Sequence, residues 1–216
     1  GDTGAQYRFL LPGPVWTDAD QAQVFTLLAA TARPGGIAVI SGSQPPGVPP
    51  DFPARLAAAL PDTLLVLDTS GATLTEAVSQ PIPGLAVLRM DSDEAESLSG
   101  HPLPDPKATA DFASALVAQG TAATVLIARG AEGNVLATAT QRLIASPPKV
   151  QMQSAVGAGD SFVAALVLAM AHRQDWPEAL TLATAAAAAA VMTPATELCR
   201  AEDVARLVPQ VSVTSI

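Results

Sequence analysis

The segment Val156-Gly157-Ala158-Gly159-Asp160-Ser161-Phe162 leads directly into an apolar stretch, residues 163–171, that is typical of a buried helix. Its two glycines allow the backbone to approach a ligand closely, because no Cβ stands in the way. The free N–H groups of the first helical turn and the positive end of the helix dipole face one point, and Asp160 adds a carboxylate there. Transfer of a phosphoryl group requires this combination of donors for anionic oxygens and a base for a hydroxyl.

A simpler interpretation of this segment stays open. Asp160 could merely cap an apolar helix while the glycines form an ordinary turn. For an isolated Gly-x-Gly-Asp sequence that interpretation would be preferred. The apolar helix that follows, the hairpin expected upstream and the expected position at the edge of a sheet favour the functional interpretation.

The rest of the chain alternates between predicted strands and helices. Apolar runs predict strands over residues 6–11, 37–40, 63–67, 85–88 and 124–127, and a hairpin of two more, 134–138 and 141–145. Helices are predicted from Thr17 to the stop at Pro34, over 51–60, after Gly71, from Ser92, over 109–119, from Ala158, from Trp176 and near Ala201. This alternation indicates an α/β fold with a mostly parallel sheet that helices cover on both faces.

Several polar or glycine-containing segments come directly after predicted strands. They are Ser41-Gly42-Ser43, Asp68, residues 89–94 and residues 128–130. In open α/β sheets, ligands bind beyond the carboxyl ends of the strands. We therefore expect these segments to lie together on one rim of the sheet.

The composition indicates a compact globular protein and excludes several classes of partner. Of the 216 residues, 49% are apolar and 14% charged, which argues against disorder. The net charge is −9 and the chain has no basic cluster, so a nucleic-acid partner is not expected. The single cysteine, Cys199, excludes an intrachain disulfide and fits a reduced, cytoplasmic setting. No signal peptide is recognised, and the most apolar run, 182–192, is too short to cross a membrane.

Gly157-Ala158-Gly159-Asp160 resembles the second signature of the PfkB, or ribokinase-like, carbohydrate kinases. Matches in order and spacing extend over nearly the whole chain and favour the phosphofructokinase branch of that family; they include Gln6-Tyr7-Arg8-Phe9, Ile40-Ser41-Gly42-Ser43, Asp68-Thr69-Ser70-Gly71 and Ser154-Ala155-Val156. The resemblance implies a three-layer αβα nucleotide-binding and catalytic domain over residues 15–216, with residues 1–14 as the remnant of a small β-sheet lid. It also implies an ATP-dependent kinase of a sugar phosphate, first of all fructose 6-phosphate, that uses Mg²⁺ and a monovalent cation such as K⁺. The assembly expected from it is a homodimer formed through the lid strand.

The same resemblance implies roles for individual residues. Asp160 would accept the proton of the acceptor hydroxyl, while Gly157, Ala158 and Gly159 supply an anion hole. The other implied contacts are Ser41 and Ser43 with the sugar phosphate; Arg89, Asp91, Ala128, Gly130, Gly133 and Thr193 with the nucleotide; Asp91 and Glu94 with Mg²⁺; and Ser154 and Val156 with a monovalent cation.

Each of these secondary sites has an ordinary structural alternative. Ser41 and Ser43 could be turn residues, Asp91 and Glu94 could complement a helix dipole, and residues 129–133 could be a plain connection between strands. Family members also carry a preceding segment of roughly one hundred residues, more than half of a typical domain. The alternative function is therefore a non-catalytic remnant of a sugar kinase that serves as a nucleotide-binding or structural domain.

Overall fold

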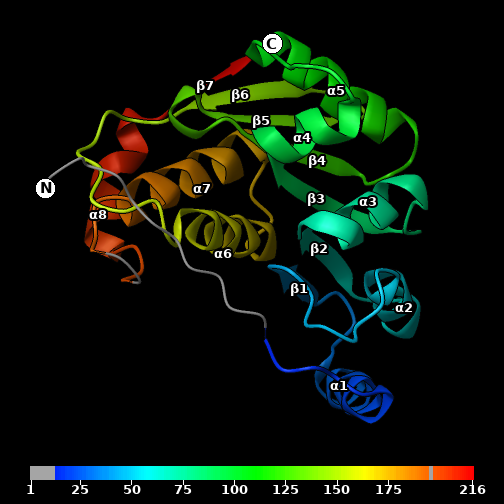
Figure 1. Ribbon diagram of the computed structural model, residues 1–216. Helices are drawn as coiled ribbons and strands as arrows, with labels where there is room; N and C mark the ends of the chain where they lie inside the picture. Colours follow the sequence, from blue (N-terminus) through cyan, green and yellow to red (C-terminus); the bar gives the residue numbers. More distant parts are fainter. Residues whose placement is uncertain (1–12, 195–196) are drawn as a thin grey trace, which may run out of the picture.

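The computed structural model describes residues 13–194 and 197–216, and a seven-stranded sheet forms its centre (Figure 1). The strands follow one another across the sheet in chain order: β1 (Ile37–Ser41), β2 (Leu64–Asp68), β3 (Leu85–Asp91), β4 (Thr124–Ala128), β5 (Asn134–Thr138), β6 (Arg142–Ser146) and β7 (Ser212–Ser215). β1 to β4 pair in parallel, whereas β5, β6 and β7 are added by antiparallel pairing, so the sheet is mixed. The lid strand expected over residues 6–11 lies outside the described residues.

Helices connect the parallel strands and then cover the sheet. They are α1 (Asp18–Thr31), α2 (Phe52–Ala59), α3 (Gly71–Ser79), α4 (Ser92–Ser99), α5 (Pro106–Ala118), α6 (Ala158–Ala171), α7 (Trp176–Ala190) and α8 (Ala201–Leu207), with short 3-10 turns η1 (Gly130–Glu132) and η2 (Val208–Gln210). α5 begins earlier than the predicted start at Thr109. Its cap explains the difference, because Asp105 accepts a hydrogen bond from the N–H of Ala108 at 2.7 Å and proline suits the first helical position.

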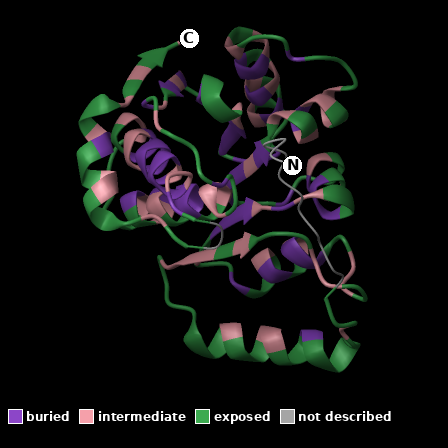
Figure 2. Cartoon of the chain, turned by 60° about the vertical axis from the view of Figure 1, so that its left-hand side comes forward, coloured by how far each residue is buried: buried purple, intermediate pink, exposed green. Residues whose placement is uncertain are grey.

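Two hydrophobic cores lie on the two faces of the sheet, because successive side chains of a strand point in opposite directions. Leu65 and Leu67 of β2 pack in the core beneath α2, α3, α4 and α5. Val66 lies in the opposite core, with Phe162 and Leu166 of α6 and residues of α7. α8 packs on the outer side of α7 (Figure 1). The expected three-layer αβα arrangement is confirmed, and Figure 2 shows the buried residues gathered along the sheet and the inner helix faces.

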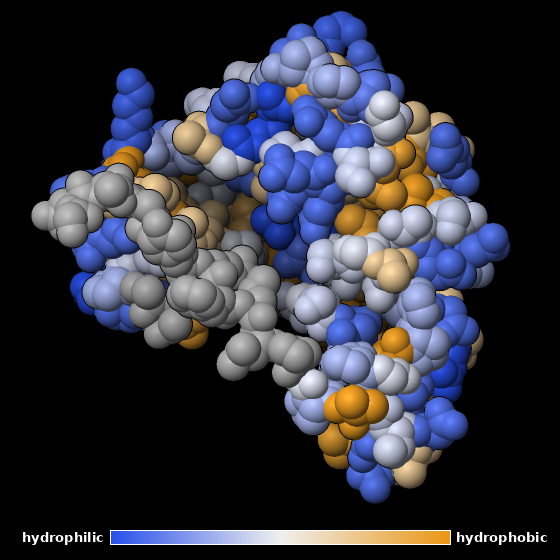
Figure 3. Space-filling model, viewed as in Figure 1, coloured by the Kyte–Doolittle hydropathy of each residue, from blue (hydrophilic) through white to orange (hydrophobic). Residues whose placement is uncertain are grey.

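α1 lies at one end of the molecule and is mostly exposed (Figure 2). Thr17 and Asp20 form the capping box that starts it, as the sequence predicts. Its packing includes a contact between the rings of Phe25 and Phe52, whose centroids are 5.2 Å apart. Leu27 of the same helix is 64% exposed. Figure 3 shows hydrophobic residues on the surface in the region of α1. Among the described helices, none is long and apolar enough to cross a membrane.

Candidate active site

The carboxyl ends of β1, β2, β3 and β4 form one rim of the sheet, as the alternation of strands and helices predicts (Figure 1). The strand registers place Ser41 beside Asp68, Asp68 beside Arg89, and Asp91 beside Ala128. Residues from distant parts of the sequence therefore meet at the edge where an α/β sheet binds its ligands.

The last residue of β1 and the turn that follows it carry the two serines that the resemblance assigns to the sugar phosphate. The N–H of Gly42 donates to the carbonyl of Asp68 at 2.8 Å, and the Thr69 hydroxyl donates to the carbonyl of Gly42 at 2.9 Å. These bonds hold the turn against the end of β2. Ser41 and Ser43 are exposed on it and are accessible to a ligand.

The segment around Asp160 forms the start of α6, as predicted. Gly157 is the N-cap residue with φ +83°, a conformation that favours glycine. Asp160 lies in the first turn, where helical N–H groups lack partners within the helix. Its carboxylate accepts a hydrogen bond from the Ser41 hydroxyl at 3.3 Å, across 119 residues of sequence. The side chain thus reaches across the rim to β1, which the interpretation as a simple helix cap does not predict.

Arg89 lies directly beside this segment. Its Nη1 forms an ion pair with Asp68 Oδ1 at 2.8 Å, and its guanidinium carbon lies 5.9 Å from the centre of the Phe162 ring. A Cβ on Gly159 would be 3.1 Å from Nη1, so the absence of a side chain there makes room for the guanidinium. Arg89 Nε is buried without a hydrogen-bond partner among the described residues. This arrangement places a cation next to the backbone that could cradle a phosphate.

Asp91 and Glu94 form a capping box at the start of α4. The Glu94 N–H donates to the Asp91 carboxylate at 2.9 Å, and the Asp91 N–H donates to the Glu94 carboxylate at 2.8 Å. Burial, and then the nearby Asp91 charge, raise the pKa of Glu94, while the hydrogen bond from Asp91 opposes the rise. The capping alternative is therefore realised. The carboxylates still lie at the rim, and within the described residues no cluster of three potential metal ligands occurs.

The turn after β4 contains the two glycines that the resemblance assigns to the nucleotide. Gly130 begins η1 with φ +56°, and Gly133 ends the turn with φ +118°. A Cβ on Gly133 would lie 2.3 Å from the carbonyl oxygen of Ala145, so the turn approaches β6 more closely than a side chain would allow. The Arg129 N–H donates to the Gly133 carbonyl at 2.8 Å and closes the turn.

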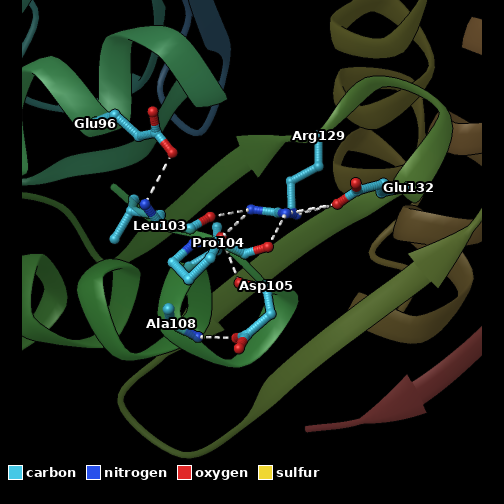
Figure 4. Close-up of polar contacts among 8 residues, drawn as sticks. Glu96, Leu103, Pro104, Asp105, Ala108, Arg129 and Glu132 are labelled. Atoms are coloured by element: carbon cyan, nitrogen blue, oxygen red, sulfur yellow. Dashed lines mark hydrogen bonds and ion pairs between the residues drawn. The ribbon is translucent and has the colours of Figure 1, made fainter. Parts of the chain in front are cut away.

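The side chain of Arg129 is a part of this rim that the sequence does not predict. It is 7% exposed, and it joins the turn after β4 to the connection between α4 and α5 (Figure 4). The signal that could have drawn attention to it is an arginine directly after a buried strand, beside a turn rich in glycine.

The residues assigned to the monovalent cation and Thr193 lie near the end of α7. The buried Ser154 hydroxyl accepts a hydrogen bond from the Val156 N–H at 3.1 Å, and the Ser154 N–H donates to the Val191 carbonyl. The Thr193 hydroxyl lies within hydrogen-bond distance of two backbone carbonyls, that of Ala190 at 2.7 Å and that of Glu197 at 2.8 Å. The hydroxyl of Thr193 is therefore part of a local turn and is not directed at a ligand.

Comparisons with known proteins agree with this architecture. A model of the pfkB family of carbohydrate kinases matches residues 12–203. The ATP-dependent 6-phosphofructokinase isozyme 2 of Mycobacterium tuberculosis is 36% identical over 208 residues, which are 94% of this chain and 60% of that protein. The 1-phosphofructokinase of Xanthomonas campestris is 36% identical over 205 residues, 93% of this chain and 61% of its own length.

A solved structure gives the same result. The crystal structure of phosphofructokinase-2 from Escherichia coli in complex with potassium superposes with a TM-score of 0.88 at 29% identity, covering 96% of this chain and 67% of that chain. Against the first curated relatives, the chain spans about 60% of their length. On the family model, the shared fold and the signature at the start of α6, the chain belongs to the PfkB family of carbohydrate kinases.

Proposed function

We propose that the protein containing this chain is an ATP-dependent kinase that transfers the γ-phosphate to a hydroxyl of a sugar phosphate, with fructose 6-phosphate as the first candidate. The observation that carries the proposal is the position of Asp160, in the first turn of α6 and hydrogen-bonded to Ser41 at 3.3 Å. The names of the relatives, 6-phosphofructokinase and 1-phosphofructokinase, support it.

In the proposed reaction, Asp160 takes the proton of the acceptor hydroxyl while its oxygen attacks the γ-phosphorus. The new O–P bond forms as the bond from the γ-phosphorus to the bridging oxygen breaks, and ADP leaves with that electron pair. The N–H groups of Ala158 and its neighbours, together with the dipole of α6, stabilise the charge on the transferring oxygens. Gly157 and Gly159 keep the approach free of side chains, and the rim serine Ser43 contacts the sugar phosphate.

The nucleotide and the ions would be held by the other rim residues. Asp91 and Glu94 suit Mg²⁺, because this ion keeps several waters and binds through one or two carboxylates together with phosphate oxygens. When bound, Mg²⁺ neutralises phosphate charge. Arg89 would contact the phosphates, and the backbone at Ala128, Gly130, Gly133 and Thr193 would line the nucleotide site. Ser154 and Val156 would hold a monovalent cation; potassium is present in the structure of the E. coli relative.

Assembly and location belong to the same proposal. We expect a cytoplasmic homodimer in which residues 6–11 contribute a lid strand. One of the similar structures is the tetrameric inhibited form of E. coli phosphofructokinase-2, and light scattering of the full-length protein should distinguish a dimer from a tetramer.

A second candidate is a non-catalytic domain that binds a nucleotide or serves a structural role. The observation that favours it is the capping box, in which Asp91 and Glu94 already satisfy each other's N–H groups. A folded full-length protein that turns over no sugar phosphate in the presence of Mg²⁺ and ATP would support this candidate.

The deciding experiment is Mg²⁺-dependent ATP turnover by the full-length protein with fructose 6-phosphate, tagatose 6-phosphate and fructose 1-phosphate. Asp160→Asn should lower kcat by at least about a hundredfold, the lower end of general-base contributions, while ATP still binds. Asp62→Asn, at an exposed turn before β2, is the matched control and should leave kcat unchanged. Full turnover by Asp160→Asn would refute its role as the base.

A further inference from the structure

Arg129 directly precedes η1, the turn proposed to contact the nucleotide. All three nitrogens of its guanidinium donate hydrogen bonds to acceptors within the protein. Its Nη1 donates to the Leu103 carbonyl at 2.8 Å and to the Thr109 hydroxyl at 2.6 Å. Its Nη2 donates to the Pro104 carbonyl at 3.3 Å and to Glu132 at 2.5 Å, and its Nε donates to the same carboxylate at 3.0 Å. Because a guanidinium has five N–H donors, these contacts account for all of them (Figure 4).

The connection between α4 and α5, residues 100–105, provides the two carbonyl acceptors and is held by further hydrogen bonds. The Leu103 N–H donates to Glu96 of α4 at 2.8 Å, and Asp105 caps α5 through the N–H of Ala108 at 2.7 Å. The Thr109 hydroxyl is buried and donates to the Asp105 carbonyl at 3.0 Å. The guanidinium therefore joins the rim turn to a segment that α4 and α5 already hold in place.

We propose that Arg129 is a positioning residue that holds the turn of residues 130–133 in its nucleotide-binding conformation before the nucleotide arrives. The inference rests on the proposed function, because it assumes that this turn contacts ATP. Two glycines with positive φ give the turn a large choice of conformations. A rigid anchor beside them removes that freedom in advance, and binding then loses less conformational entropy.

The chemistry of the anchor requires arginine. Carbonyl acceptors from Leu103 and Pro104 approach one edge of the planar fork, while the Glu132 carboxylate takes the edge formed by Nε and Nη2. A lysine has a single nitrogen and could not span both groups. Since the Arg129 side chain is 7% exposed and Leu103 is buried, a replacement must also leave the Leu103 carbonyl with a hydrogen-bond donor.

The test compares Arg129→Lys and Arg129→Leu with wild type in the full-length protein. Loss of preorganisation should raise the KM and the Kd for ATP about tenfold in Arg129→Leu, as expected for losing hydrogen bonds from a charged donor, and less in Arg129→Lys. The kcat and the KM for the sugar phosphate should change little, because Asp160 and Ser41 lie on other elements. Hydrogen–deuterium exchange should become faster in residues 101–105 and 130–133 and nowhere else.

Two further variants control for damage to the fold. Arg206→Leu breaks the exposed ion pair between Arg206 and Asp203 and should leave the KM for ATP unchanged. Thr109→Val removes one acceptor of Arg129 while conserving the shape of the side chain, and it should raise the KM for ATP about threefold. This variant takes the place of Arg129→Leu in the test if Arg129→Leu fails to fold.

The outcomes separate the two claims. If wild type binds ATP and the foldable Arg129 and Thr109 variants bind it equally well, the positioning role is overturned and the proposed function stands. A rise in the KM of both substrates with a matching fall in kcat would also overturn the role, because it indicates general damage. If wild type binds no ATP, the proposed function is refuted, and so is the positioning role that rests on it. Selective loss of ATP affinity, with faster exchange in the two segments, establishes the role.

Discussion

Replacing Gly133 by alanine tests whether the turn after β4 depends on the absence of a side chain. The added Cβ would lie 2.3 Å from the carbonyl oxygen of Ala145 and 3.2 Å from its carbonyl carbon, both in the backbone of β6. The dihedrals, φ +118° and ψ −164°, also fall in a region that essentially only glycine occupies. Such a conformation costs about 1–3 kcal/mol, and displacing a strand backbone adds to it, so the free energy of unfolding should fall by roughly 3 kcal/mol or more.

Urea denaturation of the variant and of wild type measures this loss. Gly100→Ala is the matched control, because Gly100 has φ +72° and nothing within 4 Å of its ideal Cβ position. The free energy of unfolding of the control should fall only by the cost of placing alanine in the left-handed conformation, about 1–2 kcal/mol. The difference between the two variants measures the contact with β6 together with the higher backbone cost of the Gly133 conformation. Equal losses in both variants, or a change below about 0.5 kcal/mol in Gly133→Ala, would refute the reasoning.

Two other predictions concern charges at the rim. In a double-mutant cycle of Asp68→Asn and Arg89→Met, the 2.8 Å ion pair should appear as a coupling of about 1–3 kcal/mol in the free energy of unfolding, and additive losses would contradict it. Because burial raises the pKa of Glu94 above its ordinary 4.5, its charged form is disfavoured in the folded state. That penalty disappears as the pH falls from above the raised pKa to below 4.5, so wild type should gain stability relative to Glu94→Gln over this window. A stability difference that stays constant in denaturation series across these pH values would show that the pKa is not raised.

Most of the parallel part of the fold could be predicted because three of its strands, β2, β3 and β4, are largely buried on both faces. β2, β3 and β4 read as continuous apolar runs between helical segments, and such runs are characteristic of parallel strands. β7 could not be recognised in the same way, since Val213 is its only apolar residue. Its pairing with β6, in which Val213 lies opposite Ala145, joins distant parts of the chain. The predicted start of α5 at Thr109 is too late, because the helix begins at Pro106 behind the cap at Asp105, one turn before its first buried residue.

In the candidate site, too, some features follow from local sequence patterns and others depend on tertiary contacts. The rim positions follow from strand ends, and the spacing of Asp91 and Glu94 already suggested a helix start. The hydrogen bond between Asp160 and Ser41 depends on how α6 packs over β1, which no local pattern contains. Arg129 was missed because two of its acceptors are backbone carbonyls, and every residue has a carbonyl, so no residue type marks such a partner.

The proposed phosphate site lies in a chain of net charge −9, so it needs a local source of attraction for an anion. The carboxylates of Asp68 and Asp160 lie there. The Arg129 guanidinium is engaged with loop carbonyls and Glu132, and Arg89 Nη1 is paired with Asp68. A polyanionic ligand would therefore be drawn by the N–H groups at the start of α6, by a divalent ion on the carboxylates, and by Arg89 in competition with Asp68. Under the proposed function, glycines suit the segment before Asp160 better than lysines would, because backbone N–H groups attract phosphate without adding a charge that the neighbouring carboxylates would neutralise.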